Sequence, residues 1–298
     1  AVKERGILSA SMRTVLITGA NKGIGFALAK AVLSYAKDTA VLLGSRSEAR
    51  GEAAVQALVA ADPEWSTRLR LVVIDVASKT SVDAAAGQVR GPLYAIVNNA
   101  GIMGADLAFE SVLNVNARGP ERVCDAFLPM VDDTGGRVVN ISSASGPNFV
   151  AQCSAARQAG FTNRETSLAD YHALLDQGLE LQRTGGLRAA GFGQGQSYGF
   201  SKACLNLFTM IVARQRPELY VNACTPGFIA TDLTRPIAEA QGASPADMGM
   251  KPPEKGTVAP MHLLFGEVRG SGWYFGSDAQ RSPLDRYRAP GDPPYEGP

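Results

Sequence analysis

Residues 14–25 read TVLITGANKGIG, and this stretch decides the fold. Its first half is an apolar, β-branched run typical of a buried strand, and its second half is a glycine-rich turn leading into an Ala/Leu-rich helical pattern over 24–36. Glycines here let a backbone approach a pyrophosphate closely, and the start of the helix offers unpaired N–H groups. The order strand, turn, helix therefore favours a dinucleotide-binding unit over an ordinary glycine turn.

The same alternation of short apolar strands and longer helical patterns continues along most of the chain. Apolar strands separated by helices predict an α/β fold, a single doubly wound parallel sheet (Rossmann-type) with helices on both faces. We expect one dinucleotide-binding and catalytic domain over 14–276. We expect 1–13 to be an N-terminal arm or a remnant added for expression. The proline-rich residues 277–298 should form an irregular tail.

A long segment interrupts the alternation between Ser143 and Tyr198. It covers 54 residues, 144–197, and its part 167–182 carries Leu168, Tyr171, Leu175 and Leu179 at steps of three and four. That spacing predicts an amphipathic helix, so we expect a helical insertion before Tyr198. Either the rest of the chain or a partner must cover its apolar face.

Bulk composition excludes several classes of protein. The 29 basic and 28 acidic side chains leave a net charge of +1, which gives no general attraction to nucleic acid or to a membrane surface. We find no apolar stretch long enough to span a bilayer and no signal-peptide core in 1–13. Four dispersed cysteines and two histidines without ligand-spaced partners predict a reduced, cytoplasmic protein with no metal site.

The end of the second predicted strand indicates which dinucleotide binds. An NAD site would place an acid there for the ribose 2′-hydroxyl, but this chain has Arg46. Arg46 can fork onto a 2′-phosphate, and Lys22 in the glycine loop adds a second positive charge, so the pair favours NADP(H). Asp75 and Val76 end the third strand, where they could meet the adenine; Asp75 could instead cap the next helix.

Three strand and helix ends carry the candidate chemistry. Small residues in NNAG, 98–101, leave room for a cofactor to cross the sheet edge. Tyr198 and Lys202 stand four apart on one helical face, where an ammonium would favour the phenolate. Ser143 ends the fifth strand, where its hydroxyl could stabilise an oxyanion; a turn serine is the competing interpretation.

In this order, TGxxxGxG, NNAG, a strand-end serine and YxxxK resemble the short-chain dehydrogenase/reductase family over about 14–275. The resemblance implies that Tyr198 is the acid/base, Lys202 its ribose-binding partner, Ser143 the carbonyl-polarising residue and Asn116 part of a proton relay. The loop after the sixth strand would contact the nicotinamide. The cofactor-binding residues are then expected to be Gly19, Asn21, Lys22, Gly23, Ile24, Gly25, Arg46, Asp75, Val76, Asn99, Ala100, Gly101, Tyr198, Lys202, Pro226, Gly227, Ile229 and Thr231.

Within that family, the long spacing from Ser143 to Tyr198 resembles the monomeric NADPH-dependent carbonyl reductases. In them a helical insertion covers the face that other members use to oligomerise, so the resemblance implies a monomer. One departure is that Asn99 and Asn116 stand only 17 positions apart. Either the mouth of the site is trimmed and more open, or residues are missing from this chain.

Our main hypothesis is an NADPH-dependent oxidoreductase that reduces a ketone, aldehyde or quinone, a small-molecule carbonyl substrate, with Tyr198 as general acid. The same residues would serve an NADP-dependent alcohol dehydrogenase acting on a steroid, prostaglandin or terpenoid. A third hypothesis, from another class, is a protein that senses NADP without turnover. An intact Tyr198, Lys202 and Ser143 set argues against it, because a sensor needs no acid.

Overall fold

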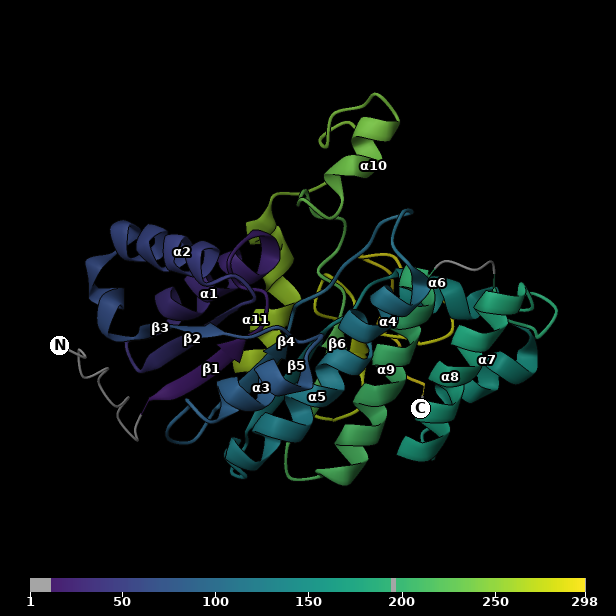
Figure 1. The fold of residues 1–298 in the computed structure, drawn as a ribbon, viewed down its shortest axis with the longest axis horizontal. Helices are drawn as coiled ribbons and strands as arrows, with labels where there is room; N and C mark the ends of the chain where they lie inside the picture. Colours follow the sequence, from purple (N-terminus) through teal and green to yellow (C-terminus); the bar gives the residue numbers. More distant parts are fainter. Residues whose placement is uncertain (1–11, 194–196, 298) are drawn as a thin grey trace.

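One sheet organises the chain, whose computed structural model describes residues 12–193 and 197–297 (Figure 1). Its eight strands lie in the order β3-β2-β1-β4-β5-β6-β7-β8, parallel as far as β7 and antiparallel at β8. Successive strands are added on one side of β1 as far as β3 and on its other side from β4 onward, so the carboxyl ends of β1 and β4 form the crevice of a doubly wound sheet. The strands are β1 (Arg13–Ile17), β2 (Thr39–Ser45), β3 (Leu69–Val73), β4 (Ala95–Asn98), β5 (Arg137–Ile141), β6 (Tyr220–Cys224), β7 (Tyr274–Phe275) and β8 (Arg281–Ser282).

Alternation along the strands divides the core into two layers. Val15 and Ile17 belong to one buried cluster, while Leu16 between them belongs to the other. The first cluster packs under α1 (Gly23–Tyr35), α2 (Glu48–Ala61) and α11 (Val258–Phe265). The second packs under α3 (Lys79–Ala86), α4 (Phe109–Asn116), α5 (Arg118–Phe127) and α9 (Ser197–Gln215). The expected Rossmann-type sheet with helices on both faces is therefore confirmed.

The insertion over 144–197 contains α6 (Ser145–Ala151), α7 (Ala155–Thr162) and α8 (Leu168–Thr184), which gather beside α9 in Figure 1. A capping box between Ser167 and Asp170 starts α8. On the predicted apolar face, Tyr171 and Leu175 are fully buried. The chain itself therefore covers much of this face.

Several boundaries differ from the sequence expectations. The apolar run 93–98 should form one strand, but β4 begins only at Ala95, and Leu93 forms an isolated bridge with Val131. The helical pattern over 109–128 should form one helix, but it breaks at Ala117, which separates α4 from α5. The segment 277–298, expected to be irregular, contributes β8 to the edge of the sheet. The loop after β6 carries α10 (Arg235–Ala240), which projects from the body in Figure 1.

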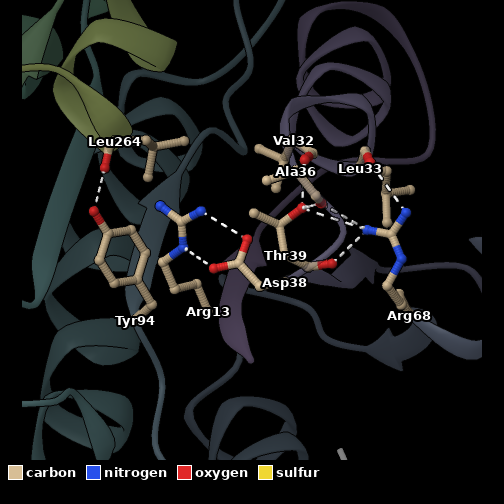
Figure 2. Close-up of polar contacts among 9 residues, drawn as sticks. All are labelled: Arg13, Val32, Leu33, Ala36, Asp38, Thr39, Arg68, Tyr94 and Leu264. Atoms are coloured by element: carbon tan, nitrogen blue, oxygen red, sulfur yellow. Dashed lines mark hydrogen bonds and ion pairs between the residues drawn. The ribbon is translucent and has the colours of Figure 1, made fainter. Parts of the chain in front are cut away.

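Hydrogen bonds and an ion pair connect the residues at the amino ends of β1, β2 and β3, opposite the crevice (Figure 2). The Arg68 guanidinium donates to the carbonyls of Leu33, Ala36 and Thr39 at 3.2, 3.1 and 2.6 Å. The Leu33 and Ala36 carbonyls lie at the end of α1, where a cation suits the helix dipole, and Thr39 begins β2. Arg13 pairs with Asp38 through two bonds of 2.9 and 2.8 Å. Within the described ranges, no helix combines the length and the apolarity that crossing a membrane requires.

Candidate active site

The glycine loop between β1 and α1 is shaped for close approach of a ligand. Gly19 and Gly23 have φ of +64° and +57°, in the left-handed region that favours glycine. A Cβ on Gly25 would lie 2.5 Å from Asn99 Nδ2 and 2.6 Å from the Gly19 carbonyl oxygen. No side chain caps the first turn of α1, so its N–H groups are available to an anion.

Asn99 ties this loop to the end of β4. Its Nδ2 donates to the carbonyl oxygens of Thr18 and Gly19 at 2.9 and 3.1 Å. The Thr18 hydroxyl in turn accepts from the backbone N–H groups of Asn99 and Ala100, at 3.0 and 3.1 Å. These bonds cross from the end of β1 to the end of β4, the two neighbouring strands that flank the crevice, so Asn99 holds both walls of the crevice together.

A cleft of about 490 Å³ occupies this edge of the sheet. It extends from the glycine loop, past the ends of β2 and β3, to the start of α9. Of the residues predicted to bind a cofactor, those that line it are Gly19, Asn21, Lys22, Gly23, Ile24, Gly25, Arg46, Asp75, Val76, Asn99, Ala100, Gly101, Tyr198, Lys202, Pro226 and Thr231. The remaining predicted residues, Gly227, Ile229, Ser143 and Asn116, lie beside the cleft and do not line it.

The cleft is more cationic than the protein as a whole. The positively charged residues that line it are Lys22, Arg46, Arg50, Lys202 and Arg235, and the negatively charged ones are Asp75 and Asp232. This gives a local excess of three positive charges, compared with a net charge of +1 for the chain. A negatively charged ligand is the natural complement of such a cleft.

At the end of the cleft beside β2, the structure adds one residue that the sequence analysis missed. Among the described residues, nothing hydrogen-bonds to the Arg46 guanidinium or pairs with it. Arg50 lies in the first turn of α2, and both arginines line the cleft, Arg46 just after β2 and Arg50 at the start of α2. A second arginine in the helical turn that follows Arg46 is the signal that could have revealed it.

Lys22 already has a partner in this structure. Its Nζ lies 2.7 Å from Oδ2 of Asp232, in the loop that carries α10, and both side chains are more than half exposed. Lys22 therefore joins the glycine loop to the loop after β6. A ligand phosphate would compete with the Asp232 carboxylate for it.

Asp75 does not cap the next helix, which was the alternative interpretation. Its Oδ1 accepts from the backbone N–H of Ala77 at 3.0 Å, which shapes the turn before α3. The helix cap itself is Ser78, whose hydroxyl accepts from the N–H of Ser81. Asp75 also lines the cleft, so the turn and the ligand-facing position belong to the same residue.

Tyr198, Lys202 and Ser143 come together where β5 and α9 meet. Lys202 is buried and its Nζ donates to the Ile141 carbonyl oxygen at 2.8 Å, 5.6 Å from the centre of the Tyr198 ring. The side chain of Ser143 lies next to the Tyr198 phenol. The Ser143 hydroxyl also accepts from the Ser145 backbone N–H at 3.1 Å. The fold thus brings a phenol, a hydroxyl and an amine to one corner of the cleft.

Burial changes how these groups hold their protons. It raises the pKa of Tyr198, and the neighbouring Ser143 hydroxyl opposes this. It lowers the pKa of Lys202 from 10.5 to about 8, because the ammonium is removed from water. We expected Lys202 to favour the phenolate, but in this structure the balance keeps Tyr198 protonated at neutral pH.

Asn116 lies behind this corner, fully buried at the end of α4. Its Oδ1 accepts from the Ile102 N–H at 2.8 Å, and its Nδ2 donates to the Ile102 carbonyl oxygen at 2.9 Å. Nδ2 also donates to the Ser201 hydroxyl at 3.1 Å, and that hydroxyl donates to the Tyr198 carbonyl oxygen at 2.7 Å. The Asn116 side chain therefore connects the loop after β4 to the start of α9.

A second hollow, the tail pocket, opens on the other side of Ser143. Its volume is about 300 Å³, and it is lined by Ser143, Gly227, Phe228 and the segment 282–290 of the C-terminal tail. Ile229, by contrast, is buried and forms an isolated bridge with Lys251 at the base of the α10 loop. Ser143 and Gly227 thus face a separate space from the one that Tyr198 and Lys202 line.

Comparison with known proteins settles which family these features belong to. A sequence model of the family described as short chain dehydrogenase matches residues 13–162, just over half of the chain. The chain belongs to the short chain dehydrogenase family. It is an oxidoreductase of that family, and this membership leaves the non-catalytic sensor hypothesis without support.

Named relatives of this family member extend over most of its length. It is 31% identical over 272 residues to carbonyl reductase (NADPH) 1 from Sus scrofa, covering 86% of this chain and 88% of that protein. It is 30% identical to (+)-neomenthol dehydrogenase from Arabidopsis thaliana, covering 78% and 89%. Menthone neomenthol reductase from Mentha piperita has a similar structure, with a TM-score of 0.73, 25% identity and coverage of 90% and 99%. The resemblance to carbonyl reductases is confirmed.

Proposed function

We propose that this oxidoreductase reduces the carbonyl group of a small molecule with NADPH, and that Tyr198 donates the proton. The observation that carries the proposal is the corner at which the Tyr198 phenol lies next to the Ser143 hydroxyl and beside the buried Lys202. A protonated phenol next to a second hydroxyl is the arrangement that carbonyl reduction needs, because the oxygen becomes negative as the carbon is reduced. The names of the relatives that reduce carbonyls support the same reaction.

The shape and charge of the cleft support NADPH as the cofactor. The left-handed glycines, the space that a Cβ on Gly25 would fill and the uncapped start of α1 form a cradle for the pyrophosphate. Arg46 and Arg50 would hold a 2′-phosphate, since both guanidiniums line that end of the cleft. When bound, NADPH supplies the hydride.

Each residue of the corner has a distinct task in this proposal. Ser143 donates a hydrogen bond to the carbonyl oxygen and stabilises the negative charge that develops there. Tyr198 transfers its proton to the same oxygen. Lys202 positions the cofactor ribose and carries the charge that makes loss of the Tyr198 proton easier. Asn116 acts as a positioning residue through Ser201 and the loop after β4.

A second direction of the same reaction is favoured by one relative. The (+)-neomenthol dehydrogenase name points to a terpenoid alcohol as the compound oxidised. Reduction is our first choice, because Arg46 and Lys22 in the cleft favour NADP(H), which cells usually keep reduced. Measuring both directions with the same ketone and alcohol pair would decide which one the protein favours.

The decisive experiment is NADPH consumption against a panel of quinones, ketones and aldehydes, with NADH as the control cofactor. Tyr198→Phe should lower kcat by about 10²- to 10⁴-fold with little change in NADPH affinity, because only the transferable proton is lost. Arg46→Asp should reverse the preference between NADPH and NADH. Full turnover by the Tyr198→Phe variant would overturn the proposed mechanism.

We also propose that the protein works as a cytoplasmic monomer. The helices α6, α7 and α8 lie beside α9, where they cover a face of the core. All four thiols are free and buried, which supports a reducing compartment. Sedimentation of the purified protein at micromolar concentration tests the oligomeric state directly.

A further inference from the structure

The tail pocket meets the cleft at the residues we propose as catalytic. Ser143 lines the tail pocket, whereas Tyr198 lines the cleft, and the two side chains lie next to each other. A carbonyl group held by both hydroxyls would therefore lie at the junction of the two spaces. The cofactor would occupy the cleft, so the tail pocket is the space left for the rest of the substrate.

The C-terminal tail makes a firm wall for this pocket. The Arg288 guanidinium is buried and forms two bonds to the Asp278 carboxylate, at 3.1 and 2.8 Å. It also donates to the carbonyl oxygens of Asp292 and Pro293 at 2.6 and 2.9 Å. Since β8 pairs with β7 just before it, the segment 282–290 is anchored at both ends. The pocket is thus built into the fold.

Aromatic side chains lie open in this pocket. Phe228 is 39% exposed and Tyr287 is 52% exposed, and both line the space beside Ser143. Large apolar groups left exposed inside a hollow, next to polar groups that can react, are typical of a ligand site. An aromatic substituent of the substrate could pack against either ring.

The charge in the pocket has one sign. Arg286 and Arg288 are the charged residues among those lining it, and no carboxylate lines it among the described residues. Asp278 balances the charge of Arg288. Arg286 pairs at 2.9 Å with its neighbour Asp285, and the two side chains are 60% and 37% exposed. Its guanidinium also lies over the Tyr295 ring, 5.5 Å from the ring centre. Such an exposed pair contributes little stability, so Arg286 can turn to a ligand at small cost.

We propose that the tail pocket selects aromatic carbonyl compounds that carry a carboxylate, with the aromatic group against Tyr287 and the carboxylate at Arg286. The inference rests on the proposed carbonyl reduction and adds a substrate class to it. It makes the tail, which contains neither the glycine loop nor the Tyr198 corner, the element that determines specificity.

The test compares an aryl keto acid with its methyl ester, which have the same ring and differ in charge. The wild-type protein should show the higher kcat/KM for the acid. Arg286→Gln should lower the ratio of acid to ester by about tenfold, the usual scale for one charge-assisted hydrogen bond. The matched control is Arg183→Gln on α8, which removes another exposed, ion-paired arginine and should leave the ratio unchanged.

The aromatic contact has its own variants. Tyr287→Ala should raise KM for both compounds about fivefold to tenfold, whereas Tyr287→Phe, which keeps the ring, should remain close to wild type. Tyr35→Ala is the control, because Tyr35 is 50% exposed and lies at the far end of α1. If Tyr287→Ala changes neither KM, the ring does not contact the substrate and the inference fails.

A small aliphatic aldehyde separates failure of this inference from failure of the proposed function. If the wild-type protein does not reduce the aldehyde or either aryl compound with NADPH, the proposed function is wrong. If it reduces the aldehyde but treats the acid and the ester alike, and Arg286→Gln leaves their ratio unchanged, only the inference about the tail pocket is overturned.

Discussion

Replacing Asn116 with alanine should lower the free energy of unfolding and should also raise KM for the substrate. The side chain makes three hydrogen bonds from a fully buried position, two to the backbone of Ile102 and one to the Ser201 hydroxyl. Each such bond stabilises the folded state by about 1 kcal/mol, which sets an upper value of about 3 kcal/mol. Ile102 is only half-buried, so water can recover part of the loss. We therefore expect a decrease of about 2 to 3 kcal/mol in the free energy of unfolding.

Loss of the two hydrogen bonds to Ile102 should also loosen the wall of the cleft, because the loop that contains Ile102 carries the cleft residues Met103 and Leu107. We expect KM for the carbonyl substrate to rise, with a smaller fall in kcat. Urea titration followed by steady-state kinetics measures both effects. Ser111→Ala on the exposed face of α4 is the matched control, with an expected change below about 0.5 kcal/mol. A loss of less than about 1 kcal/mol for Asn116→Ala would refute this account of its hydrogen bonds.

Three further predictions concern the amine, the glycine loop and the far edge of the sheet. Burial lowers the pKa of Lys202 to about 8, so its amine loses the positive charge as the pH rises through that value. We therefore expect kcat/KM for reduction to fall over the same pH range. A flat pH profile for the wild-type protein would contradict a need for this charge. Gly25→Ala should destabilise the fold by about 1 to 3 kcal/mol, because its Cβ would meet the Gly19 carbonyl oxygen at 2.6 Å, and thermal melting should show less protection by NADPH. Arg68→Met should lower the free energy of unfolding by about 1 to 3 kcal/mol, measured by thermal unfolding, because Arg68 caps α1 at the edge away from the cleft. Its kcat should stay unchanged, and Lys37→Met, at an exposed position, is the control. A lower kcat for Arg68→Met would show that this edge is coupled to the site.

Local patterns in the chain were sufficient to predict the architecture. The run of 14–25 predicted a strand, a turn and a helix, because apolar periodicity and glycine conformation act within a few residues. The spacing of four between Tyr198 and Lys202 placed them on one face for the same reason. The predicted helix boundary at Ser167 is also local, since the capping box with Asp170 spans a single turn.

The tertiary structure decided the relations between distant residues. Tyr198 and Ser143 meet only because β5 and α9 pack side by side, and no local spacing encodes that contact. The same holds for Lys22 with Asp232, 210 positions apart, and for Asn116 with Ser201, 85 positions apart. Strand register and helix packing set these distances. The sequence alone therefore determined the sheet and the set of reactive groups, while only packing decided that the C-terminal tail would close a pocket beside Ser143.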